Sequence, residues 1–188
     1  MSREPGGTAP VVPRSFILRP AAPPDFAAIR DIYAPYVLTG LATFEETPPD
    51  VAELSRRHRH VAGLGLPYLV AEADGAVRGY AYAAPYRDRS AYRFTVEGSI
   101  YVDQGWHRRG VGRALLERLI ADSAAAGKRQ MVAVIGDSAN AASIGLHAAA
   151  GFQPVGTLRS AGFKHGRWVD SVLMIRPLGE GDTTLPGP

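Results

Sequence analysis

The chain is most constrained by the run His107-Arg108-Arg109-Gly110-Val111-Gly112-Arg113, which joins an apolar strand at residues 100–102 to a strongly periodic helix. Glycines let the backbone approach a ligand closely, and the free N–H groups of a helix start point at it along the positive end of the helix dipole. The run therefore predicts an anion cradle. It lacks the Lys-Ser/Thr ending of a nucleotide phosphate loop and the Gly-x-Gly-x-x-Gly pattern of a dinucleotide site. From these residues alone, a glycine-assisted turn with a solvated arginine patch is an equally good interpretation.

Composition limits the class of protein. The 188 residues suffice for one domain, and 46% hydrophobic with 21% charged residues is typical of a soluble globular protein. The absence of cysteine excludes disulfides, thiolate metal sites and a cysteine nucleophile, and it favours the cytoplasm. No segment has the ~18 apolar residues of a membrane span, so no membrane association is expected.

The basic residues are nearly all arginine, and the net charge is +3. The planar guanidinium fork suits phosphate and carboxylate groups, so an anionic small molecule fits this excess. The run Arg56-Arg57-His58-Arg59-His60 lacks interleaved aromatic residues. It therefore indicates a solvated helix face or helix end, and nucleic acid is not expected as a partner.

Hydrophobic periodicity predicts one domain at residues 15–178, between a flexible extension at 1–14 and a disordered tail at 179–188. Strands are expected at residues 16–19, 66–73, 76–84, 94–103, 131–135, 152–158 and 169–176. Helices are expected after Pro23-Pro24-Asp25, after Thr47-Pro48-Pro49-Asp50, from Val111 to Gly127, and from a cap at Asp137 or Ser138 through Ala150. Asp74-Gly75 predicts a hairpin, and residues 131–135 form an apolar run typical of a strand buried on both faces. This order implies a mixed sheet covered by helices.

Three features outside the turn are candidates for chemistry. Asn140 and His147 lie seven residues apart, so they share one helix face, although a histidine among alanines is more often a structural group. Glu97 lies in an apolar strand, where a carboxylate is costly unless it faces a cleft; a salt bridge to Arg93 or another arginine is an equally good interpretation. Residues 86–93 form an aromatic and cationic loop, which is either a solvated hairpin tip or a grip for a carboxylate.

The order of these parts resembles the acetyl-CoA site of the GNAT superfamily of N-acetyltransferases. The shared pattern is a strand, the turn His107-x-x-Gly110-x-Gly112, a helix, a buried strand, and Asn140-x-x-Ser143-Ile144-x-Leu146-His147-x-x-x-Gly151-Phe152. Residues 95–102, 140–147 and 162–170 are similar to the branch of phosphinothricin and methionine sulfoximine acetyltransferases. The resemblance extends from about Phe16 to Leu178.

The resemblance implies a GNAT fold, an α/β (α+β) single domain whose mixed, mostly antiparallel central sheet is splayed at the acetyl-CoA site and flanked by helices. It also implies an acetyl-CoA co-substrate and no metal. The residues expected to bind the CoA pyrophosphate, chiefly through backbone N–H groups, are Arg108, Arg109, Gly110, Val111, Gly112 and Arg113. The backbone of Ile100, Tyr101 and Val102 is expected to pair with the pantetheine arm, which Asn140 contacts from the last helix. One of those strand amides is expected to polarise the thioester carbonyl.

The resemblance also assigns the catalytic and acceptor positions. Glu97 matches the family's catalytic carboxylate, and an ammonium substrate needs such a base before its nitrogen can attack. His147 stands where many relatives carry a tyrosine acid, and its expected role is to donate a proton or to orient substrate or water. The positions that line the amino-acid pocket in relatives are occupied here by Arg87, Asp88, Arg89, Glu97, Gly98 and Ser99. His107 stands where glutamine or arginine usually begins the turn, which adds a titratable group beside the phosphates.

The sequence therefore predicts an enzyme that transfers acetyl from acetyl-CoA to the α-amine of a small L-amino acid or analogue by direct attack, with Glu97 as base. Methionine sulfoximine, methionine sulfone and phosphinothricin are the expected acceptors. Another primary amine, a protein N-terminus, or a non-catalytic role as an acyl-CoA-binding regulator are the alternatives. Polyamines are disfavoured because the loop at residues 86–93 is rich in arginine. The resemblance further implies a homodimer; detoxifying and metabolic roles both stay open.

Overall fold

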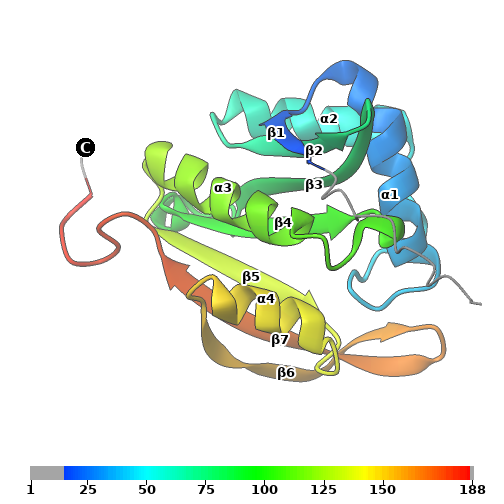
Figure 1. Ribbon diagram of the computed structural model, residues 1–188. Coiled ribbons are helices and arrows are strands. Elements are labelled where there is room, and N and C mark those ends of the chain that lie inside the picture. Colours follow the sequence, from blue (N-terminus) through cyan, green and yellow to red (C-terminus); the bar gives the residue numbers. More distant parts are fainter. Residues whose placement is uncertain (1–14, 187–188) are drawn as a thin grey trace, which may run out of the picture.

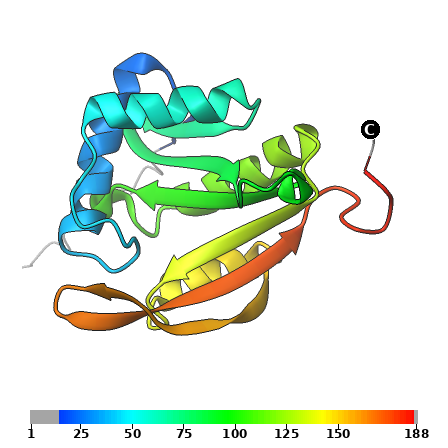
Figure 2. The same cartoon turned by 180° about the vertical axis from the view of Figure 1, so that it is seen from behind.

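The computed structural model describes residues 15–186, which form a seven-stranded sheet in the order β1-β2-β3-β4-β5-β7-β6. The strands are β1 Ile17–Pro20, β2 Tyr68–Ala73, β3 Ala76–Pro85, β4 Thr95–Val102, β5 Gln130–Gly136, β6 Gln153–Lys164 and β7 Arg167–Pro177. The helices are α1 Phe26–Leu38, α2 Val51–Gly63, α3 Val111–Ala125 and α4 Ala141–Ala149, with short 3-10 turns at Pro23–Asp25, Ser90–Tyr92 and Gln104–Trp106. Helices α3 and α4 cover one face of the sheet, and α1 and α2 cover the other (Figures 1 and 2). The predicted mixed sheet flanked by helices is confirmed.

Local chemistry explains most of these elements. In α1 the buried residues Phe26, Ile29, Ile32, Tyr33 and Val37 recur at helical spacing, as the sequence predicts. The backbone N–H of Glu53 donates to Asp50 at 2.8 Å, which caps α2. Between β2 and β3, Asp74 and Gly75 have φ angles of 53° and 71°, which a two-residue hairpin turn requires. The predicted antiparallel hairpin is thus confirmed.

The start of α4 differs from expectation, because neither Asp137 nor Ser138 caps it. The cap is Asn140, whose Oδ1 accepts a hydrogen bond from the Ser143 N–H at 3.2 Å. Asp137 has a φ of 69°, and its carboxylate accepts from the Ala139 N–H at 3.1 Å, so it closes a turn ahead of the helix. The hydroxyl of Ser138 instead donates to Asp170 of β7 at 2.8 Å. All these residue types favour caps, and the tertiary contact decides between them.

The last two strands are longer than predicted. β6 extends to Lys164 because the hairpin continues beyond an irregularity between Leu158 and Gly162. Its tip, His165-Gly166, has φ angles of 49° and 72°. β5 differs from the prediction of a strand buried on both faces, because the side chain of Val134 is 39% exposed.

The sheet opens between its two central strands. β4 and β5 run parallel and pair only from Thr95 to Glu97 with Gln130 to Val132. Every other pairing in the sheet is antiparallel. Beyond that short ladder the two strands diverge, as both views show (Figures 1 and 2). Residues 98–102 of β4 and 133–136 of β5 therefore border an opening in the sheet.

The chain ends add two observations. The extension predicted to be flexible, residues 1–14, lies outside the described residues. Within the tail predicted to be disordered, the Arg129 guanidinium donates to Glu180 at 3.3 Å, to Thr184 at 3.1 Å and to the Leu185 carbonyl at 3.3 Å. Among residues 15–186, no helix is long and apolar enough to cross a membrane.

Candidate active site

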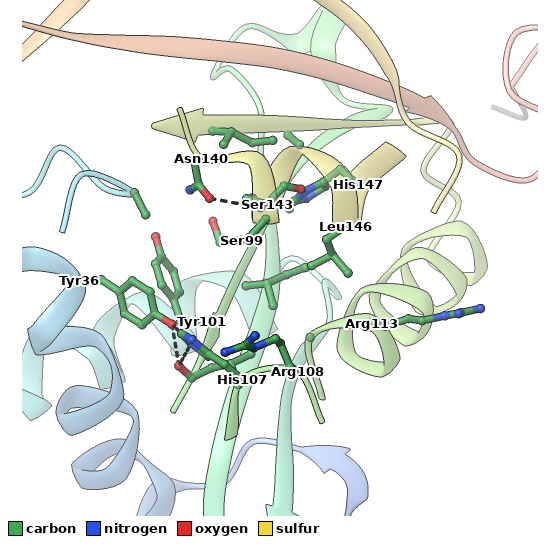
Figure 3. A pocket seen from close by; sticks show the side chains of 18 of the residues that line it. Tyr36, Ser99, Tyr101, His107, Arg108, Arg113, Asn140, Ser143, Leu146 and His147 are labelled. Atoms are coloured by element: carbon green, nitrogen blue, oxygen red, sulfur yellow. Dashed lines mark hydrogen bonds between the residues drawn. The ribbon is translucent and has the colours of Figure 1, made fainter. Parts of the chain in front are cut away.

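A cavity of about 710 Å³ occupies the opening between β4 and β5 (Figure 3). Its walls come from β4, the turn before α3, β5 and α4. The predicted site residues that line it are Gly98, Ser99, Ile100, Tyr101, Val102, Arg108, Gly110, Gly112, Arg113, Asn140 and His147. The opening of the sheet thus gathers most of the predicted co-substrate positions into one place.

One end of the cavity is a cradle of backbone. Gly110 precedes α3 in a left-handed conformation with φ of 83°, and no side chain caps the helix. The first N–H groups of α3 are therefore available to an anion, and the helix dipole favours negative charge there. A Cβ on Gly112 would come within 3.6 Å of Leu146 and Val102 in this wall. The structure therefore has the backbone geometry that the glycine-rich turn predicts.

Two residues of the predicted turn do not line the cavity. The guanidinium of Arg109 lies 5.0 Å from the centre of the Trp106 ring, and the Val111 side chain is buried in the core. Arg113 lines the cavity but pairs with Glu117 at 2.7 Å. The Val111 side chain is thus unavailable to an anion, whereas the exposed Arg109 guanidinium lies over Trp106, which itself lines the cavity.

The end of β4 is held by a small hydrogen-bond network that the sequence does not reveal. The Tyr36 hydroxyl, from α1, donates to the Val102 carbonyl at 2.6 Å (Figure 3). His107 Nε2 lies 2.9 Å from that hydroxyl and 3.2 Å from the same carbonyl. Because the Tyr36 hydroxyl donates its proton to the Val102 carbonyl, we assign His107 Nε2 as the donor to the Tyr36 hydroxyl oxygen. His107 and Tyr36 thus fix the strand end beside the turn.

Asn140, at the cap of α4, and His147, within the helix, both line the cavity. His147 Nδ1 donates to the Ser143 carbonyl at 2.9 Å, and the ring meets Phe152 edge-on at 5.0 Å. Burial lowers the pKa of His147, and the hydrogen bond to the Ser143 carbonyl partly opposes this. The neutral ring therefore prevails at pH 7 and presents Nε2 as a hydrogen-bond acceptor.

Glu97 precedes the cavity wall on β4 without itself lining the cavity. Its neighbours across the sheet are Ala84 and Val132. Burial raises the pKa of the Glu97 carboxyl, and the positive charge of Arg87 partly lowers it. Of the arginines considered as a salt-bridge partner of Glu97, Arg93 lies over the Phe94 ring at 4.5 Å and donates to the Ser90 carbonyl. Arg87 is the arginine whose charge acts on Glu97.

The other predicted acceptor residues separate into two groups. Gly98 and Ser99 line the cavity, whereas Arg87, Asp88 and Arg89 are exposed in the loop between β3 and β4 and do not. The Arg87 guanidinium lies 4.9 Å from the centre of the Tyr86 ring. This loop is therefore linked to the site through the charge of Arg87 on Glu97.

Several lining residues escape sequence reasoning. They are Tyr36, Ala42, Gln104, Trp106, Ala133, Val134, Ile135 and Ala142. Tyr36 shares the apolar stripe of α1 and packs against the core, so periodicity marks it as a core residue and gives no reason to place it in a site. Val134 is an apolar residue that β5 leaves exposed, but this exposure becomes visible only in the folded structure.

Comparison with known families decides the assignment. The acetyltransferase (GNAT) domain family matches residues 18–173. The chain belongs to this GNAT family. It is therefore an acetyltransferase that uses acetyl-CoA.

Relatives of this GNAT protein cover most of its length. It is 57% identical over 162 residues to a phosphinothricin N-acetyltransferase of Alcaligenes faecalis, covering 86% of this chain and 82% of the relative. It is 40% identical over 156 residues to an L-methionine sulfoximine/L-methionine sulfone acetyltransferase of Salmonella typhimurium, covering 83% and 91%. A crystal structure of a phosphinothricin acetyltransferase from Sinorhizobium meliloti with acetyl-CoA is 49% identical, with a TM-score of 0.88 over 92% of this chain and 93% of that one.

The residues of this GNAT protein fit acetyl-CoA. The uncapped start of α3 provides N–H groups for a pyrophosphate, and the apolar and backbone walls of β4 and β5 continue from it into the sheet opening. Beyond Glu97, β4 pairs with β3 but not with β5, so its edge toward β5 offers backbone groups to an arm that lies along it as an added strand.

Proposed function

We propose that this GNAT protein acetylates the α-amine of a small L-amino acid or analogue, with phosphinothricin, methionine sulfoximine and methionine sulfone as the leading acceptors. The observation that carries the proposal is the run Glu97-Gly98-Ser99 on β4. Gly98 and Ser99 line the cavity, and Glu97, which is partly buried, precedes them on the strand. The positive charge of Arg87 lowers the pKa of the Glu97 carboxyl. Relatives named for these three acceptors, at 40% and 57% identity, support the choice of substrate class.

In this mechanism acetyl-CoA supplies an acetyl thioester, and the chain provides position and proton transfer. Backbone N–H groups at Gly110 to Arg113 hold the pyrophosphate, and the free edge of β4 aligns the arm. A β4 amide near Ile100 donates to the thioester carbonyl, where negative charge develops. Glu97 accepts the ammonium proton, directly or through one water, so that the amine nitrogen has a free electron pair. The nitrogen then bonds to the acetyl carbon, the C–S bond breaks, and the second proton lost by the nitrogen passes to the CoA thiolate through water, while Glu97 returns its proton to solvent.

His147 is proposed to orient the reacting amine or a water. Its Nδ1 is committed to the Ser143 carbonyl, and its lowered pKa keeps Nε2 unprotonated. An unprotonated Nε2 accepts a hydrogen bond from an amine or water more readily than it delivers a proton to a leaving thiolate. The acid role then requires a protonated ring, which burial disfavours.

Arg87 and Arg89 are proposed to attract the carboxylate or anionic tail of the acceptor. Both are exposed beside the strand that carries Glu97. Because the two guanidinium groups bear no ion pair among the described residues, their charge is available to an acidic substrate. Asp88 is proposed to contact the amine end of the acceptor.

The decisive experiment is an acetyl-CoA assay of thiol release over the common amino acids and the three analogues. We expect the highest kcat/KM with the analogues. Glu97→Gln should lower kcat by about 10²-fold or more, the range of a lost general base. Binding of acetyl-CoA without thiol release for any acceptor would instead indicate a non-catalytic regulator.

A second arm tests the arginine loop. Arg87→Ala should raise KM more for phosphinothricin, which has an acidic tail, than for the neutral methionine sulfone. An equal rise for both acceptors would argue against direct recognition of the tail.

We further propose that the enzyme is a cytoplasmic homodimer. Large apolar side chains are exposed along the β6–β7 hairpin, at Val155, Leu158, Phe163 and Trp168. An exposed apolar edge strand favours pairing with another chain. The cysteine-free sequence and the co-substrate suit a reducing compartment that contains acetyl-CoA.

A further inference from the structure

Lys164 is a buried charged residue near the tip of the β6–β7 hairpin. Its relative exposure is 2%, although most of β6 is exposed. Its Nζ donates to the Thr43 carbonyl at 2.7 Å and lies 3.4 Å from the Tyr36 carbonyl. Both acceptors are main-chain groups of one continuous segment. A buried ammonium is costly unless it is bonded, so the position of this segment is coupled to the hairpin.

The segment in question is the crossing loop, residues 39–50, together with the last turn of α1. The Tyr36 carbonyl belongs to that last turn, where the helix dipole is negative and favours a cation. Burial lowers the pKa of Lys164, and the negative charges of Glu46 and Glu45 on the crossing loop raise it. The loop therefore supplies one hydrogen-bond acceptor and the compensating charge for the lysine, and the last turn of α1 supplies the other acceptor.

Close packing joins the same surfaces. A Cβ on Gly162 of β6 would come within 2.6 Å of the Phe44 ring. At the end of β5, the place of a Cβ on Gly136 is taken by the Leu41 carbonyl. Both views show the crossing loop beside the end of the hairpin (Figures 1 and 2). The loop is thus fixed against β5 and β6, on one side of the sheet opening.

The crossing loop also contacts the other side of the opening. Thr43 Oγ1 lies 2.8 Å from the Tyr33 hydroxyl, which donates to Glu45 at 3.0 Å. The Tyr33 ring packs edge-on against Tyr101 of β4 at 4.6 Å, and Tyr101 lines the cavity. Ala42 lines the cavity directly. The loop therefore bridges the two halves of the sheet where β4 and β5 diverge.

We propose that Lys164 is a positioning residue for the acceptor amine. By holding the Thr43 and Tyr36 carbonyls, it fixes the crossing loop so that Ala42 and, through Tyr33, the ring of Tyr101 form a stable cavity wall. The hydrogen bonds of Lys164 go to the Thr43 and Tyr36 carbonyls, and the cradle at Gly110 belongs to a different element, the turn before α3. Loss of Lys164 therefore loosens this wall more than it loosens the pyrophosphate cradle at the start of α3. The kinetic part of the inference rests on the proposed function.

The test replaces Lys164 by methionine, which keeps the unbranched stem and removes the charge and both hydrogen bonds. Lys128→Met is the matched control, because Lys128 Nζ also donates to a main-chain carbonyl, that of Arg93 at 2.8 Å, but at the surface. We expect Lys164→Met to raise KM for the acceptor about tenfold and to change the Kd of acetyl-CoA less than about twofold. Lys128→Met should change neither by more than about twofold.

A readout independent of activity is amide hydrogen exchange. We expect amides 41–46 to exchange about tenfold faster in Lys164→Met than in the wild type, with the amides of α3 unchanged. Unchanged exchange at 41–46 overturns the inference, as does an equal weakening of acceptor and acetyl-CoA. If the wild type acetylates none of the acceptors, the proposed function fails, and hydrogen exchange still decides whether Lys164 fixes the loop.

A second variant covers the case in which Lys164→Met does not fold. Gly162→Ala displaces the Phe44 ring from the hairpin without removing any charge. It should reproduce the rise in acceptor KM and the faster exchange at 41–46, each to a smaller extent. A Gly162→Ala protein with wild-type values for both would count against the coupling between hairpin and loop.

Discussion

At the residue scale, the environment of Glu97 sets its chemistry. A base must be deprotonated to act, and it is most effective when its pKa approaches the working pH. Burial in β4 raises the pKa of Glu97 toward that range, and Arg87 limits the rise. The sequence identifies the carboxylate and the nearby arginines, but the direction of the pKa shift depends on burial that only the folded sheet provides.

The balance between burial and Arg87 predicts a pH effect. As pH falls, Glu97 takes up a proton and kcat declines, with the midpoint above the ordinary value for glutamate. Arg87→Gln removes the charge that lowers this pKa, so the midpoint should move to higher pH. Arg89→Gln, in the same exposed loop, should leave it in place. The measurement is kcat at saturating substrates from about pH 4.5 to about pH 8. A shift to lower pH in Arg87→Gln contradicts the prediction.

At the element scale, the turn into α3 is an element that the local sequence pattern predicts. The glycine spacing and the periodic helix predict this turn, and Gly110 adopts the left-handed φ of 83° that such a turn uses. The cap of α4 is the opposite case. Asp137, Ser138 and Asn140 are all good capping residues, and the choice depends on the contact between Ser138 and Asp170 of a distant strand.

The left-handed glycine predicts a defined cost for Gly110→Ala. A Cβ there meets no atom within 4 Å, so the penalty is backbone strain alone, about 1–2 kcal/mol of unfolding free energy. Because the same backbone forms the cradle, the Kd of acetyl-CoA should rise about fivefold. Gly63→Ala is the control, since its Cβ also meets nothing within 4 Å and its φ is not positive. Thermal unfolding and titration calorimetry measure both, and equal stability of the two variants would refute the argument.

At the scale of the whole molecule, the sheet has an opening at its centre and an exposed edge at β6. The opening follows from a parallel β4–β5 ladder of only three residue pairs. The edge leaves Val155 and Leu158 exposed by 60% and 54%. An edge of this kind is stable in solution when a second chain or charged residues cover it, and apolar residues occupy it here.

The exposed edge predicts a dimer of about 40 kDa, twice the 20.0 kDa of one chain, in light scattering after gel filtration. The double variant Val155→Lys with Leu158→Lys should be monomeric, because charge on an edge strand opposes pairing. Leu64→Lys, which changes an exposed leucine away from β6, should stay dimeric. A wild type that is monomeric at about 10 μM would exclude a stable homodimer.

Sequence by itself determined the helices and strands, their order, the glycine turn and the family, because these depend on periodicity and turn chemistry within a few residues. Asn140 and His147 line the same cavity, although Asn140 caps α4 and does not lie within it. Only tertiary structure decided that Tyr36 holds the end of β4, that Arg109 turns onto Trp106, and that Lys164 is buried against the crossing loop. Each of these depends on contacts between segments distant in sequence, and no local pattern records which segments will meet.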